Sequence, residues 1–370
     1  MDLLLQYDSA KFNDYILKLK TIASFSKLFS ENDAPYIHSR SAENIYTDSL
    51  GAINVSRNDS TADAVYDRTG VGIKTFINVS NQKIAEFNGL RPRYAHLHGI
   101  DLARAIAGFR NNRIDITMRA YGLNRIIYHY IVREPAIIKI FEEEMNRVDI
   151  DNITITVETD KKIAFTDGIE QYEFVYSKST LYKRFNLEHP FVEFEVSIIS
   201  DPLDELVEYL NYQDLTPGLI SFYTPPSEPD TLIIPLYTED AGGNRKVWER
   251  SGLNQWNAAG RPRHLNEVYI NFPARIRHAN PDFFPHRDVR WDLRLPDGRH
   301  LSMKLCQDNE KAIMSDPNRD LGQWLLRDVL NLGEGQLLTY DYLLEVGIDS
   351  VIFKKEGEGQ YSVDFISFDD

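Results

Sequence analysis

Hydrophobic and polar positions follow two different periods along the first two hundred residues. Apolar residues recur at helical spacing over 8–30 and again over 99–109, which predicts two helices. The intervening 51–79, rich in Val, Ile, Thr and Asn and broken by turn residues, predicts consecutive strands. Segments 81–88 and 136–148 have a helical pattern. The beginning of the chain is therefore expected to mix helices with strands.

The pattern changes to short strands in the next part of the chain. Three segments, 152–158, 161–168 and 171–177, are strand-like runs with turn signals between them, and 191–199 is a fourth. A helix is expected over 201–212, because Pro202 suits a first helical turn. This region predicts a mixed-sheet α/β domain.

Five prolines fall between residues 215 and 238, and such a cluster predicts a domain boundary. A chain of 370 residues also favours two domains. We therefore predict an N-terminal domain over 1–215, a linker over 216–235 and a C-terminal domain over 236–370.

Strand patterns dominate beyond that boundary. The Asp297–Gly298 pair predicts a hairpin turn within 290–306, and one helix is expected over 320–332. The other expected strands are 267–273, 337–347, 350–355 and 361–368. The C-terminal domain is therefore predicted to be mainly β.

Composition and cysteine content narrow the class of protein. Hydrophobic residues make up 42% and aromatic residues 12% of the chain, enough for packed cores. The single cysteine, Cys306, excludes an internal disulfide and a cysteine-rich zinc site. With no signal-peptide pattern and no long apolar run, we expect a cytoplasmic protein without a membrane partner.

Charge is distributed unevenly. The formal net charge is 41 minus 56, or −15, which argues against indiscriminate nucleic-acid binding. Between Arg245 and Lys304, however, twelve basic residues minus six acidic ones give +6, and arginine is favoured over lysine. Guanidinium groups suit bidentate contacts with phosphate or guanine. Surface arginines paired with nearby aspartates would give the same count.

A candidate catalytic group begins with Lys74, in the middle of an expected strand. A lysine there is costly unless its charge is used or paired. Asp63 and Glu86 could hold a divalent cation against a phosphodiester, while Lys74 orients or deprotonates the attacking water. Asp67 competes with Asp63 for the first position. The alternative is a solvated hairpin lysine and a turn aspartate.

"ADAVYD" followed by "GIKTF" resembles the PD-(D/E)XK nuclease core, in which an aspartate on one strand precedes an acid and a lysine on the next. The usual second acid is replaced by Gly72. The resemblance to Type II restriction endonucleases implies that this acid has moved to Glu86, on a following helix. It also implies an additional Glu43 and a Mg²⁺ ion held by Asp63 and Glu86.

A second polar cluster in this domain has a composition typical of phosphate binding. A polar loop or helix entry would look the same. The DNA-binding candidates in it are Ser177, Lys178, Ser179 and Lys183.

Two polar loops in the C-terminal domain carry amide and guanidinium groups, which can pair bidentately with adenine and guanine. Asx turns and helix caps are the alternative interpretation. The first loop offers Asn254, Gln255, Trp256, Asn257, Arg261 and Arg263, and the second offers Gln307, Asp308, Asn309, Lys311, Ser315 and Asn318.

"SGLNQWNAAGRPR", "LPDGRHLSMKLCQDNEKAIMS" and "DLGQWLL" strongly resemble the C-terminal recognition domains of Type II restriction endonucleases of the NgoFVII and BfiI kind. Those domains are similar to the plant B-three pseudobarrel and to the effector domain of EcoRII. The resemblance spans about 247–368. It implies that an N-arm, residues 254–263, and a C-arm, residues 307–318, enter the major groove.

These features together predict a Type II restriction endonuclease: a PD-(D/E)XK-like nuclease domain followed by a B-three-like domain that reads double-stranded DNA. Cutting both strands predicts a homodimer, and a restriction system implies a cognate DNA methyltransferase in the same cell. A non-catalytic, sequence-specific DNA-binding regulator with an N-terminal oligomerisation domain is the alternative.

Overall fold

The computed structural model describes residues 9–56, 60–212, 231–240, 243–254 and 263–367. Its backbone divides into two compact units. Of the described residues, the N-terminal unit contains 9–56, 61–111 and 123–212, and the C-terminal unit contains Ser60, 112–122 and the part from 231 onward.

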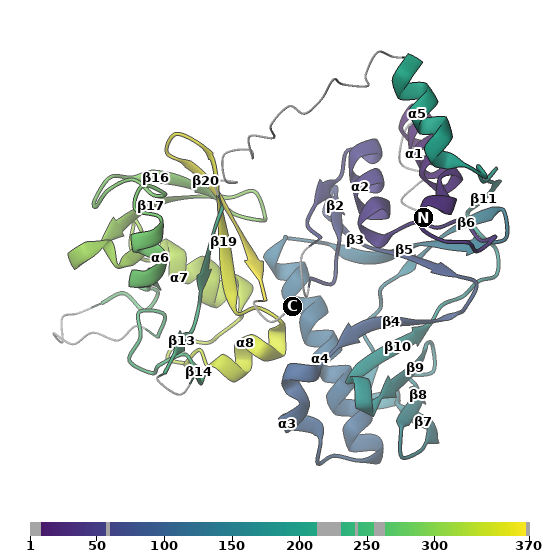
Figure 1. Ribbon diagram of the computed structural model, residues 1–370. Helices are drawn as coiled ribbons and strands as arrows, with labels where there is room; N and C mark the ends of the chain where they lie inside the picture. The colour runs from purple at the N-terminus through teal and green to yellow at the C-terminus, as the bar shows by residue number, and fades with distance from the viewer. Residues whose placement is uncertain (1–8, 57–59, 213–230, 241–242, 255–262, 368–370) are drawn as a thin grey trace. The chain divides into compact units, whose positions relative to one another are not determined.

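The N-terminal unit is built on a six-stranded mixed sheet (Figure 1). Strands β3 and β5 run parallel, and the other neighbours are antiparallel. The connection between β3 and β5 includes helix α4 (Gly99–Ala120). In spatial order the strands are β1 (Ile53–Asn54), β2 (Ala64–Tyr66), β3 (Thr69–Ile77), β5 (Arg125–Glu134), β6 (Ile137–Glu144) and β11 (Val192–Glu195).

Helices α1 (Ser9–Ser24) and α2 (Ser39–Leu50) cover one face of this sheet (Figure 1). The buried side chains of Tyr15 and Tyr46 on these helices share one core cluster with Val71 and Ile73 of β3. Because side chains alternate along a strand, residues 72, 74 and 76 face the opposite side.

A second, five-stranded antiparallel sheet lies on that opposite side (Figure 1). The three strands expected between 152 and 177 are confirmed as its members. In spatial order it consists of β4 (Asn81–Glu86), β10 (Thr180–Arg184), β9 (Gln171–Val175), β8 (Lys162–Thr166) and β7 (Thr154–Glu158).

Two helices expected from the sequence are wrong. Residues 81–86 form strand β4, which pairs with the distant β10. Residues 136–148 contain strand β6, which forms a hairpin with the adjacent β5 and also pairs with the distant β11. The apolar positions of both segments fit either period, and strand pairing decides between them.

Short helices complete the N-terminal unit. The helix expected over 201–212 is confirmed as α5 (Pro202–Tyr212). The others are α3 (Arg91–Tyr94) and the 3₁₀ turns η2 (Ser26–Leu28), η3 (Asn88–Leu90), η4 (Ile150–Asn152) and η5 (Tyr176–Lys178).

The C-terminal unit is a seven-stranded, nearly closed, barrel-like sheet. Strands β16 and β20 run parallel, and the other neighbours are antiparallel. In spatial order it consists of β12 (Thr231–Pro235), β19 (Ser350–Gly357), β20 (Gln360–Ile366), β16 (Trp291–Arg294), β17 (His300–Cys306), β18 (Ala312–Ser315) and β15 (Ile270–Asn271). A separate small hairpin joins β13 (Thr238–Glu239) to β14 (Arg245–Lys246).

Residues 231–235, expected in the linker, are strand β12 and pair with β19. A proline is tolerated at this position because β12 is an edge strand and Pro235 is its last residue. The rest of the expected linker, residues 216–230, lies outside the described residues.

Short helices pack against the sheet and complete the hydrophobic core of this unit. The helix expected over 320–332 is confirmed as α7 (Asp320–Gly322), which continues into the π-helix η7 (Gln323–Val329). The strand expected over 337–347 is wrong, because Thr339 and Gly347 cap helix α8 (Tyr340–Val346) there. The remaining short helices are α6 (Ala274–Ala279) and the 3₁₀ turn η6 (Asp308–Glu310).

The second half of α4 belongs to the C-terminal unit. Ile116 and Ala120 are part of its core cluster, and the Asn112 amide donates to Glu345 at 2.5 Å. A segment from the middle of the sequence thus completes a unit formed mostly by the end of the chain. No helix in the described part of the chain combines the length and apolarity needed to cross a membrane.

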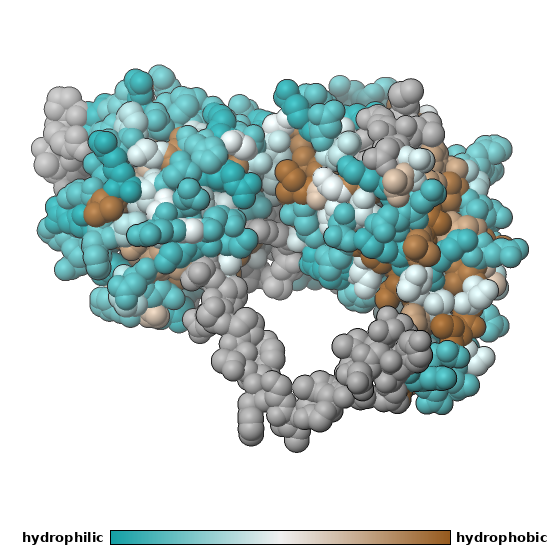
Figure 2. All heavy atoms as spheres, turned by 90° about the horizontal axis from the view of Figure 1, so that it is seen from above, coloured by the Kyte–Doolittle hydropathy of each residue, from teal (hydrophilic) through white to brown (hydrophobic). Residues whose placement is uncertain are grey.

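The face of the C-terminal unit seen in Figure 2 is largely hydrophilic. The exposed large hydrophobic side chains of the C-terminal unit include Trp248 and Val289, which are 50% and 52% exposed. The side shown offers no broad apolar face for docking, so polar contacts dominate what this surface can bind.

Candidate functional site

Asp63 and Lys74 are brought together by the β2–β3 hairpin. The Ile73 N–H donates to Oδ2 of Asp63 at 2.6 Å, and the Asp63 N–H donates to the Val71 carbonyl at 2.8 Å. The backbone bond extends the pairing of β2 with β3 by one residue before Ala64, where β2 begins, and the side-chain bond attaches the carboxyl group to β3. The Asp63 carboxyl group is therefore fixed beside the backbone residue that precedes Lys74.

Asp67, the competing aspartate, lies in the turn of the same hairpin. Asp67 and Arg68 have φ values of 42° and 60° and are exposed, and the flanking Tyr66 and Thr69 pair with each other. Lys74 lies farther along β3, toward the other end. The geometry therefore favours Asp63 over Asp67 as the partner of Lys74.

Burial perturbs both members of the pair. Removal from water raises the pKa of Asp63 to about 6; the Lys74 charge opposes this rise and the Glu43 charge adds to it. Burial lowers the pKa of Lys74, and the Asp63 charge opposes that shift. A carboxyl group and an amine whose charged forms are both disfavoured are typical of a functional site.

Glu43 is the second carboxylate near this pair. Its side chain, on helix α2, is 11% exposed, and its charge acts on both Asp63 and Lys74. Arg40 Nη1 lies 2.9 Å from Oε2 of Glu43, but this buried oxygen has no partner with hydrogen-bond geometry. Glu43 can therefore still accept a directional bond or ligate a cation.

Gly72 occupies the position of the missing acid, and the surrounding side chains have filled its space. A Cβ atom there would lie 2.7 Å from the Met145 methyl carbon and 3.2 Å from the Thr61 carbonyl oxygen. An aspartate or glutamate at this position would have to displace Met145. Gly72 therefore leaves no room for an acidic side chain unless Met145 moves.

Glu86, expected to replace that acid from a following helix, is the last residue of strand β4. Its Oε2 accepts from Lys83 at 2.5 Å, and its side chain is 46% exposed. The helical placement is thus wrong. A cation at Glu86 would compete with Lys83, whereas Glu43 acts directly on Asp63.

Arg110 was not expected from the sequence. It lies on α4, is 2% exposed, and donates from Nη2 to the Tyr128 hydroxyl at 2.8 Å. Its Nη1 is buried without a partner, and its charge further lowers the pKa of Lys74. An arginine within the otherwise apolar "IAGFR" was the sequence signal for a buried cation at this site.

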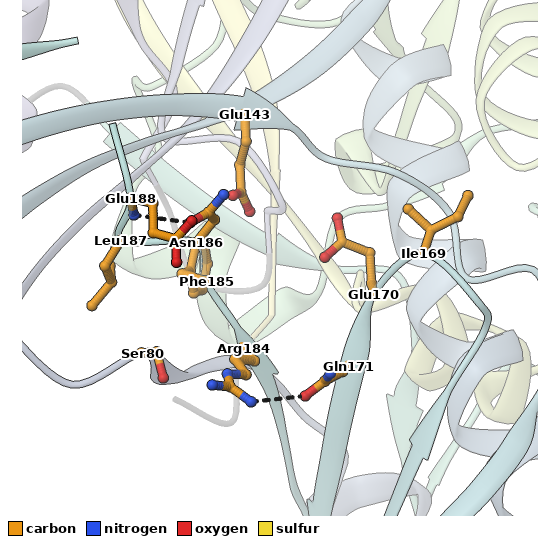
Figure 3. Close-up of a pocket in the computed structure, with 10 residues that line it drawn as sticks. All are labelled: Ser80, Glu143, Ile169, Glu170, Gln171, Arg184, Phe185, Asn186, Leu187 and Glu188. Carbon is orange, nitrogen blue, oxygen red and sulfur yellow. Dashed lines mark hydrogen bonds between the residues drawn. The ribbon is translucent and has the colours of Figure 1, made fainter. Parts of the chain in front are cut away.

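A pocket of about 550 Å³ lies between the two sheets of the N-terminal unit. Figure 3 shows Glu143 and Glu170 pointing toward its interior and Arg184 bonded to Gln171 at its edge. Lys183 Nζ donates to Glu143 at 2.7 Å and to Glu170 at 2.6 Å. Lys183 therefore forms ion pairs with two of the three glutamates that line this pocket.

The four residues of the polar cluster that were expected to contact DNA differ in their exposure to solvent. Ser177 and Lys178 are exposed, so they remain available to a phosphate. Ser179 and Lys183 are 1% and 3% exposed. Their position leaves a DNA phosphate no direct approach, because Lys183 is enclosed by its two glutamates.

The described residues of the N-arm are bound within the domain. The Asn254 side chain donates to the Leu338 carbonyl at 2.9 Å and accepts its N–H at 2.8 Å. Arg263 Nε lies 3.3 Å from Oε1 of Glu267. Both residues anchor the ends of the loop. Four candidates lie outside the described residues: Gln255, Trp256, Asn257 and Arg261.

The C-arm, residues 307–318, begins with the turn between β17 and β18 and includes β18. Asp308, Asn309 and Lys311 are exposed at its tip, and Gln307 next to them is partly exposed with a φ of 65°. These four side chains can reach a ligand. Ser315, in contrast, is 1% exposed.

Two residues at the end of the C-arm have partners within the domain. Ser315 Oγ accepts the Leu321 N–H at 2.9 Å. Asn318 Nδ2 donates to Oε2 of Glu267 at 2.8 Å. Asn318 is therefore held by the same carboxylate as Arg263.

Several arginines of the basic segment are paired with acids. Arg290 lies 2.8 Å from Asp316, and Arg299 lies 2.8 Å from both Asp297 and Asp328. These arginines remain at least half exposed. The segment thus combines surface ion pairs with cations that a polyanion can still reach.

Comparison with known proteins identifies one part of the chain. Residues 231–356 match the model of the NgoFVII C-terminal B3-like DNA-binding domain. No curated protein matches the sequence. The match covers the barrel-like sheet from β12 to β19 except for the last residue of β19, and it ends before β20, so the C-terminal unit carries a B3-like DNA-binding domain and β12 is its first strand.

Proposed function

We propose that this protein is a sequence-specific DNA endonuclease of restriction type. The B3-like domain would select the DNA site, and the N-terminal unit would hydrolyse a phosphodiester bond there with the help of Mg²⁺. The observation that carries this proposal is the β2–β3 hairpin, where Asp63 and Lys74 meet near Glu43 in a chain that also binds DNA.

The order of elements around the hairpin supports a nuclease core. An aspartate stands before β2, a lysine lies on the antiparallel β3, and β5 then returns parallel to β3 after a connection that contains α4. A glutamate from the preceding α2 completes the group. The aspartate, the lysine and the additional glutamate are those that the PD-(D/E)XK resemblance implied; Gly72 and the position of Glu86 on strand β4 rather than on a following helix are the exceptions.

Asp63 and Glu43 are the residues that would hold Mg²⁺. This ion is commonly bound by one or two carboxylates and completed by water and substrate phosphate oxygens. The described residues contain no group of three or more His, Cys, Asp or Glu arranged to hold a metal, and Asp63 and Glu43 would form a two-carboxylate site. When bound, Mg²⁺ would polarise the scissile phosphate and acidify water.

The chain's own residues perform the remaining tasks. The Ile73 N–H holds the Asp63 carboxyl group in a fixed orientation. Because the pKa of Lys74 is lowered by burial, its amine can exchange a proton with an attacking water more readily than an ordinary lysine. Arg110 adds a second cation on the same side of the sheet, which favours a bound phosphate.

A plasmid assay tests this proposal. Supercoiled DNA of varied sequence is incubated with the protein and Mg²⁺ or Mn²⁺, with EDTA as the control. We expect nicked or linear DNA with the metal alone, and run-off sequencing then gives the recognition site. Asp63→Asn should abolish cleavage, whereas Asp67→Asn in the turn should not. An absence of cleavage under every metal condition contradicts the proposal.

A homodimer is part of the same proposal. One active site cuts one strand, so double-strand cleavage at a single site requires two copies of the N-terminal unit. Sedimentation of the protein with its DNA site measures this directly. The proposal further implies a cognate methyltransferase whose modification of the site blocks cleavage.

Gly72 favours a second candidate, a non-catalytic DNA-binding regulator. With Met145 filling the space of the usual acid, the N-terminal unit would retain the fold of a nuclease without its full ligand set. This candidate predicts DNA binding by the B3-like domain and no metal-dependent cleavage in the plasmid assay.

A further inference from the structure

We propose that Glu267 is a positioning residue for DNA recognition. Its buried carboxylate joins the end of the N-arm to the end of the C-arm and sets the spacing at which the two arms meet the bases. This inference rests on the proposed reading of DNA by the two arms, and the experiment below separates the two claims.

The geometry places one carboxylate between both arms. Glu267 is 2% exposed, with Oε1 3.3 Å from Nε of Arg263 and Oε2 2.8 Å from the donating Nδ2 of Asn318. Arg263 Nη2 also donates to the Glu267 carbonyl at 2.8 Å. Arg263 ends the N-arm and Asn318 ends the C-arm, so each oxygen of Glu267 faces one arm.

The backbone on both sides of this carboxylate is fixed by packing. Ile270 pairs with Ile313, so the strands that adjoin the two arms, β15 and β18, are neighbours. The Asn266 carbonyl lies against Gly322, where a Cβ atom would approach it to 2.1 Å. Glu267 therefore extends from a rigid base, and its contacts hold Arg263 and Asn318 against that base.

Charge explains why this residue affects specificity. A buried carboxylate is costly unless it is paired, so Glu267 strongly favours the conformation in which Arg263 and Asn318 both contact it. Base-edge contacts depend on such fixed geometry. Phosphate contacts depend mainly on total charge and are insensitive to sequence.

The test uses the full-length protein and two duplexes. The wild-type protein first enriches a preferred duplex from a random pool, and a shuffled version serves as the non-specific probe. The Kd for each duplex is measured at one salt concentration for wild type and Glu267→Gln. Glutamine keeps the shape and one acceptor for Asn318 but removes the charge that holds Arg263. Glu345→Gln, at a carboxylate bonded to Asn112, is the matched control.

We expect Glu267→Gln to reduce the ratio of the two Kd values by about tenfold or more, equivalent to the loss of one base-pair contact. The Kd for the shuffled duplex should change by less than about threefold, because phosphate contacts remain. Single-base substitutions in the enriched duplex should show relaxed discrimination at positions read by both arms. A direct base reader would instead relax one base pair.

A structural role without positioning gives a different result. Glu267→Gln would then lower the unfolding temperature while leaving the Kd ratio of the folded protein unchanged, which would overturn the proposal. If that variant does not fold, Arg263→Ala, Asn318→Ala and the double variant replace it. Positioning through Glu267 predicts non-additive losses of discrimination, and additive losses contradict it. A wild-type protein without discrimination rejects the proposed DNA reading itself.

Discussion

Asp63 carries a carboxyl group whose negative charge is disfavoured in the folded protein. Burial raises its pKa from 3.8 to about 6, so the folded state binds the proton more tightly than the unfolded state. The stability linked to this proton is fully present below pH 3.8 and is lost as the pH rises through about 6. Asp63 therefore destabilises the fold at neutral and alkaline pH.

Replacing this carboxyl group should stabilise the protein at high pH. Asp63→Asn retains an oxygen that can accept the Ile73 N–H and removes the buried charge. At pH 8 we expect the free energy of unfolding to rise by about 1 to 3 kcal/mol, with no gain below pH 3.8. Urea denaturation at both pH values measures this. Asp67→Asn should change little at either pH, and a less stable Asp63→Asn protein at pH 8 would contradict the assignment.

The close packing around Gly72 leads to a prediction about the stability of the protein. Gly72→Ala should lower the free energy of unfolding by about 1 to 3 kcal/mol, because the new methyl group overlaps Met145. Adding Met145→Ala should relieve part of that loss, so the two changes would be less than additive in a double-mutant cycle. Additive losses would show that Met145 does not fill the space at this position.

At the scale of elements, α2 and β4 supply two competing carboxylates. Glu43 on α2 acts on the Asp63–Lys74 pair, whereas Glu86 at the end of β4 is held by Lys83. We expect Glu43→Gln to slow DNA nicking by at least about 100-fold at saturating Mg²⁺, since loss of a metal ligand removes several kcal/mol. Glu86→Gln should nick at nearly the wild-type rate. Single-turnover rates decide, and the opposite order would restore Glu86 as the ligand.

The whole molecule contains a unit assembled from separate parts of the chain. Ile116, on the second half of α4, is 3% exposed within the core of the C-terminal unit. Ile116→Ala should therefore destabilise that unit by about 2 to 5 kcal/mol through the cavity it leaves. Hydrogen exchange should rise in β20 and α8. Ile77→Ala, at a residue that is 48% exposed, is the control and should have no comparable effect.

The fold class was predictable because it depends on local signals. The alternation of apolar and polar residues, together with turn residues, predicted β2, β3 and three strands of the second sheet. The cluster of prolines lies close to residue 231, where the match to the B3-like domain begins. The helices expected at β4 and β6, and the strand expected at α8, were wrong. Pairing with the distant β10 decided β4, a hairpin with the adjacent β5 together with pairing to the distant β11 decided β6, and caps at both ends decided α8.

The sequence by itself determined the hairpin that carries Lys74 and two candidate aspartates, Asp63 and Asp67, because turn residues between two strand-like runs predict that the strands pair. It also determined the B3-like domain, through a match spread over 231–356. Only the tertiary structure decided that Asp63 rather than Asp67 lies next to the residue before Lys74, that Arg110 acts on Lys74, and that Glu267 contacts Asn318 as well as Arg263. Arg110 and Asn318 are far along the chain from these partners, and a local pattern carries no information about which distant side chain will share a buried site.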